Sequence, residues 1–333
     1  MTHLLSTELL ISTIKESFSK HLCQELGLIR VSSPIAVLDG TGINDDLSGV
    51  ERPVSFPVKA LGEQRALVVH SLAKWKRIRL MQLEMDVGMG ILTDMRALRP
   101  DEDYTNLHSV YVDQWDWEVR IGEDERCLAK LKDCVRKIYG VLKTVEREVY
   151  KADSSIKPVL PERIKFIHSQ ELLELYPAIS AKERERLITK EYGAVFIIGI
   201  GAGLTNGEPH DGRAPDYDDW SSINEDGFYG LNGDILVWHP TLECALELSS
   251  MGVRVNSERL LFQLGERGCM ERAQLPFHAM LLNGDLPQCI GGGIGQSRVC
   301  MFMLKKRHIG EVQVGIWDDN EREKLQESGI TLL

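Results

Sequence analysis

The hydrophobic positions near the start of the chain recur three and four residues apart, which is the spacing of one face of an α-helix. The members of this stripe are Ile11, Ile14, Phe18, Leu22 and Leu26. Gly27 follows directly, and glycine commonly ends a helix because it adopts left-handed backbone without strain. The pattern predicts a helix that ends at Gly27 and a short strand over residues 28–31, which Pro34 ends.

A longer stripe with the same spacing runs from Leu128 to Val149 and predicts an amphipathic helix that packs over a sheet. Ser180 and Glu183 have the spacing of a capping box, which predicts a helix that begins there and ends at Gly193. Apolar runs predict strands at residues 164–168, 194–200, 234–238 and 245–248.

A hairpin is predicted around residue 100. Residues 95–99 form a short strand pattern, Pro100–Asp103 breaks it, and residues 108–118 alternate polar with apolar side chains. The alternation predicts an antiparallel return strand and leaves Arg99 at the mouth of the hairpin.

A glycine run at residues 291–295 leads through Arg298 into an apolar segment that we predict to be helical. Taken alone, such a run indicates a tight turn before a core helix. Glycine also lets a planar ligand lie against the backbone, and an arginine just inside the helix can reach a phosphate, which indicates a nucleotide pocket. The spacing fits neither the dinucleotide-binding fingerprint nor a P-loop.

The segment between Gly201 and Gly233 is polar, is rich in Gly, Asp and Asn, and includes Arg213–Trp220. A loop of this length inside a compact domain is usually functional or disordered, and its aromatic and acidic residues favour function. No repeat, low-complexity segment or linker divides the chain, so we expect one domain over residues 1–333.

Composition narrows the class of protein. The net charge is −11, from 39 basic and 50 acidic residues without a basic cluster, so nucleic acid is not an expected partner. No segment approaches the ~20 apolar residues of a membrane helix, so we expect a cytoplasmic protein without a membrane partner. The 7 cysteines contain no CxxC pair, which argues against a disulfide framework or a zinc knuckle. Cys289, beside the glycine run, is the candidate for a modifiable thiol.

Three segments resemble, in order, the three motifs of the class II aminoacyl-tRNA synthetase core. Residues 27–35 resemble the first motif, Arg99–Asp103 with its return strand resembles the second, and Gly291–Arg298 resembles the third. Three further segments resemble the aspartate and asparagine subgroup, namely Ser71–Lys76, Gln114–Glu118 and Glu247–Arg254. Three ordered motifs are far more specific than one.

The first motif begins too close to residue 1 to leave room for the anticodon-binding domain that precedes the core in aspartyl- and asparaginyl-tRNA synthetases. Over nearly its whole length the chain is instead similar to the ammonia-dependent asparagine synthetases. Segments that resemble that family's signatures are residues 70–77, 108–118, 213–220 and 230–238. The resemblance implies an α/β fold, with a largely antiparallel sheet flanked by helices, and a homodimer formed through the first motif.

The resemblance also implies ATP-driven amide formation. The β-carboxylate of aspartate attacks the α-phosphorus of ATP, pyrophosphate leaves, and ammonia displaces AMP from β-aspartyl-AMP. Ammonia is the expected nitrogen donor, because glutamine-using asparagine synthetases expose an N-terminal cysteine nucleophile and this chain has Thr2.

For ATP, the resemblance assigns the α-phosphate to Arg99, the triphosphate tail to Arg298 and the adenine to Glu102, with Gly293 and Gly295 in the same site.

Mg²⁺ needs carboxylate oxygens, and Glu247 is the first candidate ligand. The acid expected seven residues earlier in aspartyl-tRNA synthetases is replaced by Pro240, so Asp234 or Glu243 is the candidate for the second ligand.

For aspartate, the resemblance implies that Lys76 and Arg254 bind the carboxylate that is not activated, while Gln114 and Asp116 bind the ammonium group. The remaining members of the predicted aspartate site are Ser71, Tyr217 and Ser250. Because the β-carboxylate must face the phosphate, the resemblance implies that aspartate lies reversed relative to its pose in a tRNA synthetase.

The incoming ammonium ion must lose a proton before it attacks, and a carboxylate near the β-carbon can accept that proton. Asp45, in the segment Gly42–Gly49, and Asp218 are the two candidates, and the residues alone do not rank them.

Two other functions stay open. One is an adenylating enzyme with a different acceptor, and the other is a non-catalytic protein that senses an amino acid and AMP. Intact Arg99, Arg298, Glu247 and Lys76 argue against the sensor. Three tryptophans either line the pocket or fill the core, namely Trp115, Trp117 and Trp220.

Overall fold

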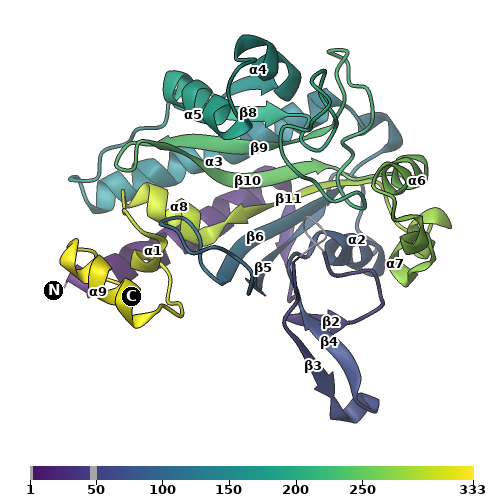
Figure 1. Ribbon diagram of the computed structural model, residues 1–333, viewed down its shortest axis with the longest axis horizontal. Coiled ribbons are helices and arrows are strands. Elements are labelled where there is room, and N and C mark those ends of the chain that lie inside the picture. Colours follow the sequence, from purple (N-terminus) through teal and green to yellow (C-terminus); the bar gives the residue numbers. More distant parts are fainter. Residues whose placement is uncertain (1–2, 46–50) are drawn as a thin grey trace.

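An eight-stranded sheet forms the centre of the molecule (Figure 1). The structure is a computed structural model that describes residues 3–45 and 51–333; Thr2 and residues 46–49 of the segment around Asp45 lie outside it. The strands of the sheet are β1 (Leu28–Arg30), β5 (Gly90–Leu98), β6 (Tyr111–Arg120), β7 (Lys165–His168), β8 (Ala194–Ile198), β9 (Asn232–His239), β10 (Cys244–Val253) and β11 (Cys289–Gly295).

These strands lie in the order β1-β5-β6-β11-β10-β9-β8-β7. Neighbours from β5 through β8 are antiparallel, whereas β1 pairs with β5, and β7 with β8, in parallel. The prediction of a largely antiparallel sheet is therefore confirmed.

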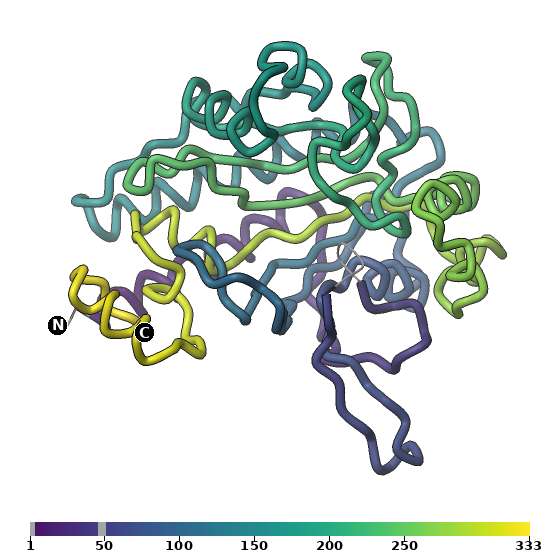
Figure 2. The backbone as a smooth tube through the Cα atoms, in the orientation of Figure 1, coloured from purple at the N-terminus to yellow at the C-terminus, as the bar shows by residue number. Residues whose placement is uncertain are grey.

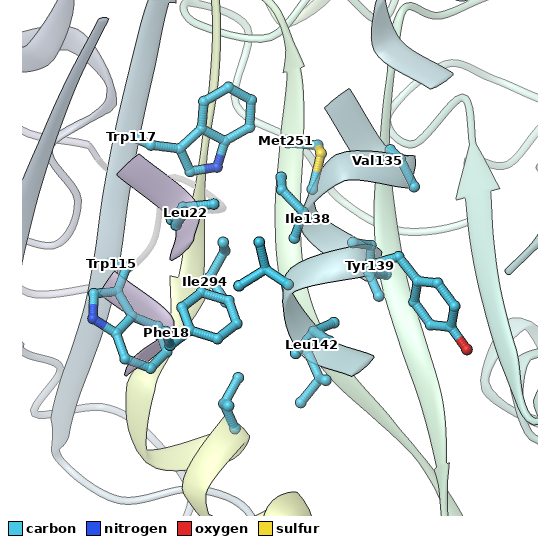
Figure 3. Close-up of a cluster of buried hydrophobic side chains, with 14 of the residues drawn as sticks. Phe18, Leu22, Trp115, Trp117, Val135, Ile138, Tyr139, Leu142, Met251 and Ile294 are labelled. Carbon is cyan, nitrogen blue, oxygen red and sulfur yellow. The ribbon is translucent and has the colours of Figure 1, made fainter. Parts of the chain in front are cut away.

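One face of the sheet is covered by α1 (His3–Leu26), α3 (Leu128–Ala152) and α8 (Gln296–Met303), which together enclose the main hydrophobic core. Figure 3 shows Trp115 and Trp117 of β6 packed in this core, where Trp115 stacks on Phe18 of α1 with ring centroids 4.2 Å apart. Both predicted amphipathic helices are confirmed, and Gly27 follows α1 with a left-handed φ of 65°.

The opposite face carries α2 (Ala73–Gln82), α4 (Ser169–Leu175) and α5 (Ala181–Tyr192), while α6 (Ser257–Glu266) and α7 (Pro276–Leu282) pack beside α2. A small sheet of β2 (Ala36–Leu38), β4 (Gln64–Val68) and β3 (Ser55–Val58) extends away from the large one, as Figure 2 shows. After α8 the chain runs through residues 304–318, which include a 3₁₀ turn (Ile309–Glu311), to α9 (Asp319–Glu327).

Three local predictions need correction. The hairpin strands are shifted, since β5 begins at Gly90 and β6 begins at Tyr111. The Ser180 hydroxyl accepts a hydrogen bond from the Glu183 amide (3.2 Å), but the Glu183 carboxylate pairs with Arg186 instead of completing a capping box.

The glycine run does not form a tight turn: it is the strand β11, paired with β6 on one side and β10 on the other. Among the described residues, no helix is both long and apolar enough to cross a membrane.

Candidate active site

A pocket of about 610 Å³ opens on the face of the sheet opposite the main core, and every residue of the predicted site lines it. These residues are Asp45, Ser71, Lys76, Arg99, Glu102, Gln114, Asp116, Tyr217, Asp218, Asp234, Glu247, Ser250, Arg254, Gly293, Gly295 and Arg298. They come from the segments around Asp45 and Ser71, from α2, from the hairpin, from the 201–233 loop, from three central strands and from α8, so the fold collects segments that are far apart in the sequence.

The alternation along β6 explains how one strand serves both the core and the pocket. Successive side chains of a strand point to opposite faces, so Trp115 and Trp117 enter the core while Gln114 and Asp116 face the pocket. The expectation that tryptophans fill the core is confirmed for these two. Trp220 is also buried outside the pocket, with Arg267 over its ring.

The glycines of β11 provide room for the longer side chains of β6. A Cβ atom at Gly293 would overlap the amide of Gln114, and one at Gly291 would overlap the carboxylate of Glu118. Larger residues at these two positions would therefore displace polar groups of the pocket wall. Glycine is needed at these positions because the side chains of β6 approach the backbone of β11 closely, and not because the backbone is left-handed.

One end of the pocket, which we name the closed end, is a network of buried charges. The Lys76 ammonium donates to Asp116 Oδ1 (2.5 Å) and to the carbonyl oxygens of Trp117 (3.0 Å) and Gly292 (2.9 Å). An ammonium has three N–H donors, so these contacts occupy all of them. Lys76 therefore orients Asp116, and its predicted direct contact with a carboxylate would require one of these bonds to break.

Arg254 is the second cation of the closed end. Its Nε and one terminal nitrogen donate to the two oxygens of Glu118 at 2.8 Å each, and its other terminal nitrogen donates to Asp218 Oδ1 at 2.5 Å. A guanidinium has five N–H donors, so two remain for a ligand. Burial raises the pKa of Glu118, but Arg254 more than offsets this and holds that pKa below its usual value.

Arg213, which the sequence analysis did not single out, links the two remaining acids of this end. Its terminal nitrogen donates to Asp234 Oδ1 (2.6 Å), and its Nε lies 3.4 Å from Asp218 Oδ2. Both oxygens of Asp218 thus face guanidinium groups. Asp45 accepts a hydrogen bond from the Ser71 hydroxyl (3.1 Å).

The other end of the pocket, which we name the open end, is built around His108. Arg298 donates to His108 Nε2 (2.8 Å) and to the carbonyl oxygen of Glu247 (3.1 Å), while Arg99 reaches the carbonyl oxygen of His70 at 3.4 Å. Burial, and next the charge of Arg298, lowers the pKa of His108 to about 4, so this ring is neutral near pH 7. A neutral ring can accept the Arg298 hydrogen bond, so His108 positions this arginine in the pocket.

The predicted metal ligands lie on adjacent strands. A β-bulge shifts the β9–β10 register between Glu247 and Ser249, so Glu247 and Ser250, three residues apart, both line the pocket. Ser250 donates to Glu247 Oε1 (3.3 Å) and lies opposite Asp234 in the register. Burial raises the pKa of Asp234 to about 6, opposed by Arg213 and reinforced by Glu247.

Two oxygen ligands suit Mg²⁺, which usually keeps several waters and binds substrate phosphates. A cation near Glu247 and Asp234 would relieve the repulsion between the two carboxylates, so these residues fit the ion. Among the described residues, no group of three or more His, Cys, Asp or Glu side chains is arranged to hold a metal. Glu243 is absent from the pocket lining.

The segment after α8 contributes to the open end, and nothing in its sequence indicated this. Gln313 accepts a hydrogen bond from the Ser109 hydroxyl (2.5 Å) and donates to Ser297 Oγ and to the carbonyl oxygen of Tyr111 (3.1 Å each). It therefore joins the hairpin to the start of α8, next to Arg298. A lone glutamine in a segment without periodicity gives no sequence signal for such a role.

Cys289 is not a modifiable thiol in this fold. Its side chain is fully buried below Glu118 and Arg254, and burial raises its pKa above the usual thiol value. A buried, protonated thiol is a poor nucleophile, so that expectation is wrong.

Comparison with known proteins now identifies the family. Residues 5–329 match the family model described as aspartate-ammonia ligase. The chain belongs to the aspartate–ammonia ligase family. An aspartate–ammonia ligase of Parabacteroides distasonis is 55% identical over 333 residues, which cover 100% of this chain and 96% of that protein. The aspartate–ammonia ligase of Clostridium perfringens is 53% identical over 327 residues, which cover 98% and 95% of the two chains.

Among solved structures, an asparaginyl-tRNA synthetase from Pyrococcus horikoshii complexed with asparaginyl-adenylate superposes with a TM-score of 0.69 at 15% identity, covering 93% of this chain and 68% of that one. An aspartyl-tRNA synthetase from Entamoeba histolytica has a TM-score of 0.66 at 14% identity and covers 95% of this chain and 59% of that one. The predicted family and the predicted synthetase-like fold of this aspartate–ammonia ligase family member are confirmed.

Proposed function

We propose that the protein catalyses the ATP-dependent amidation of L-aspartate by ammonia, through β-aspartyl-AMP, to give L-asparagine, AMP and pyrophosphate. The observation that carries this proposal is the division of the pocket into a closed end with fixed charges of both signs and an open end with arginines. The first suits a small zwitterion, and the second suits a polyphosphate.

Two polar atoms of the pocket support an orientation in which aspartate occupies the closed end and the phosphates of ATP occupy the open end. Neither atom has a hydrogen-bond partner among the described residues. Asp116 Oδ2 is a carboxylate oxygen at the closed end, and Arg99 Nε is a donor at the open end. The ammonium group of aspartate would satisfy Asp116, while the remaining two donors of Arg254 bind its α-carboxylate. The β-carboxylate then points toward Arg99 and the α-phosphate.

The first step joins a β-carboxylate oxygen to the α-phosphorus and breaks the bond to pyrophosphate. Arg99 and Arg298 would stabilise the negative charge that builds on the phosphoryl oxygens. Mg²⁺, held by Glu247 and Asp234, supplies charge neutralisation of the phosphates when it is bound. In the second step the ammonia nitrogen attacks the carbonyl carbon of the β-carboxyl group, the bond between that carbon and the AMP oxygen breaks, and one proton must leave the nitrogen.

We assign the role of the base that accepts this proton to Asp45 in preference to Asp218. Arg254 and Arg213 face the two oxygens of Asp218, so this residue holds the cations in place. Asp45 lines the same pocket and accepts a hydrogen bond from the Ser71 hydroxyl, which fixes the direction of its carboxylate. A base needs an accessible lone pair near the reacting atom.

Incubation of the purified protein with ATP, Mg²⁺, aspartate and ammonium should yield AMP, pyrophosphate and asparagine in equal amounts. Glutamine in place of ammonium should give little asparagine. If pyrophosphate exchange proceeds but no asparagine forms, the acceptor is a different one. If no nucleotide turns over, the protein is a sensor.

Two matched variants test the assignment of the base. Asp45→Asn should keep aspartate-dependent pyrophosphate exchange and lose asparagine formation. Asp218→Asn should lose both, because Arg254 and Arg213 lose their shared partner. Loss of exchange in Asp45→Asn would contradict the assignment.

A homodimer formed through the first motif and a cytoplasmic location remain predictions. In support of the former, Ile29 and Ile35 of that motif are 50% and 63% exposed, which is unusual for isoleucine. Sedimentation equilibrium of the protein against Ile35→Asp would test the dimer.

A further inference from the structure

A lysine that the sequence analysis did not consider lines the open end of the pocket. Lys182 is the second residue of α5, and its ammonium lies 3.1 Å from Asp211 Oδ2 and 3.2 Å from Glu185 Oε2. Glu185 is itself buried and lies 3.2 Å from His210 Nε2. Two acids from separate segments therefore hold this ammonium at the wall of the pocket.

Lys182 belongs to the same electrostatic neighbourhood as the arginines that would bind phosphate. After burial, the charges that lower the pKa of His108 include those of Arg298, Arg99 and Lys182. Burial lowers the pKa of Lys182, but the charges of Glu185 and Asp211, and to a smaller extent that of Glu247, more than offset this, and Glu247 lines the same pocket. Three cations and the candidate metal ligand thus converge on one region, which is the arrangement that a polyphosphate requires.

The position of Lys182 in its helix is unfavourable for helix stability. A cation in the first turn opposes the helix dipole, and such effects are typically about 0.3–1 kcal/mol. The side chain is 70% exposed, so it contributes little apolar burial in return. Residues that violate a local preference in this way are commonly found at functional sites.

We propose that Lys182 is a third phosphate-binding cation, which contacts the β- and γ-phosphates of ATP and holds pyrophosphate until it leaves. Asp211 and Glu185 keep its ammonium in place, and a phosphate oxygen replaces Asp211 when ATP enters. Lysine suits this role because its flexible stem carries a point charge that can follow a departing anion. The inference rests on the proposed formation of pyrophosphate.

The test compares Lys182→Gln with Lys190→Gln in the same helix. Lys190 stacks over Trp238, with Nζ 5.5 Å from the ring centroid, and does not line the pocket. In Lys182→Gln we expect KM for ATP and the inhibition constant of pyrophosphate to rise about five- to tenfold, a loss that corresponds to about 1–1.4 kcal/mol. KM for aspartate should stay within about twofold, and Lys182→Arg should recover part of the ATP affinity.

Unchanged KM for ATP and unchanged pyrophosphate inhibition in Lys182→Gln would overturn the inference. So would a parallel rise of both KM values with a lower Tm, since that pattern indicates a structural ion pair. The wild-type protein distinguishes this failure from failure of the proposed reaction. If it releases ADP and phosphate, the reaction is wrong; if it releases AMP and pyrophosphate while Lys182→Gln behaves like wild type, only the role of Lys182 is wrong.

Discussion

The closed and open ends of the pocket are both lined by acidic and basic side chains, but these side chains are buried at the closed end and partly exposed at the open end. At the closed end Lys76 is fully buried, and Glu118 and Arg254 are paired at two points. At the open end the side chains of Arg298 and Glu247 are 26% and 39% exposed, and that of Lys182 is 70% exposed. Fixed charges select a small ligand by position, whereas exposed cations can follow a polyanion that must enter and leave.

The largest effect should come from removing the ion pair between Arg254 and Glu118 at the closed end. Arg254→Met leaves Glu118 as a buried carboxylate without its bidentate partner, so the free energy of unfolding should fall by about 3–5 kcal/mol. Activity should fall at least about 1,000-fold, which corresponds to about 4 kcal/mol of lost stabilisation. Chemical denaturation and steady-state rates of asparagine formation measure the two effects.

The double variant Glu118→Gln/Arg254→Met is the control for this prediction. It removes the unpaired charge, so it should recover a large part of the lost stability while remaining inactive. If the double variant is no more stable than Arg254→Met, the buried charge is not the cause of the destabilisation.

A smaller effect on activity is expected from adding a side chain at Gly293, which leaves room for Gln114 in the pocket. Gly293→Ala introduces a methyl group against the Gln114 amide, which must turn away. KM for aspartate should rise about tenfold, because small displacements of a positioning group have effects of this size or larger. Gly140→Ala, at a position in α3 where an added Cβ meets nothing within 4 Å, should instead stabilise the protein by about 0.5–1 kcal/mol. Unchanged KM for aspartate in Gly293→Ala would remove Gln114 from the aspartate site.

The smallest effect concerns the pH dependence of the open end. His108 has a pKa of about 4 in the folded protein and about 6.5 when unfolded, so the folded state binds fewer protons between these values. The stability that neutral His108 contributes is therefore complete above pH 6.5 and is lost as the pH falls toward 4. His108→Gln should lose less free energy of unfolding between pH 7 and pH 5 than the wild type. Equal losses in both proteins would show that His108 does not titrate in this way.

Sequence periodicity predicted the two core helices and the strand that separates tryptophans from acids, because both patterns depend on local geometry alone. The segments that resemble the synthetase and asparagine synthetase families predicted which side chains line the pocket. Partnerships across the sheet were not predictable in the same way. The pairing of Arg213 with Asp234, and the presence of Glu247 and Ser250 on one face, depend on strand register and on a single bulge.

The glycine run was open to two interpretations for a related reason. Gly291 and Gly293 must lack a side chain because Glu118 and Gln114, on a strand more than 170 positions away, fill that space, and the segment is extended because it pairs with β6 and β10. No property of residues 291–295 by themselves distinguishes this from a turn.

Gln313 connects to Ser109 across 204 positions of sequence, and this has a consequence for the newly made chain. While the protein is being translated, the hairpin and Arg99 emerge from the ribosome long before residue 313 does. The open end acquires its wall only after that residue has been released and has packed between the hairpin and α8. The complete open end, and with it the proposed phosphate site, therefore exists only once the chain has been made through residue 313.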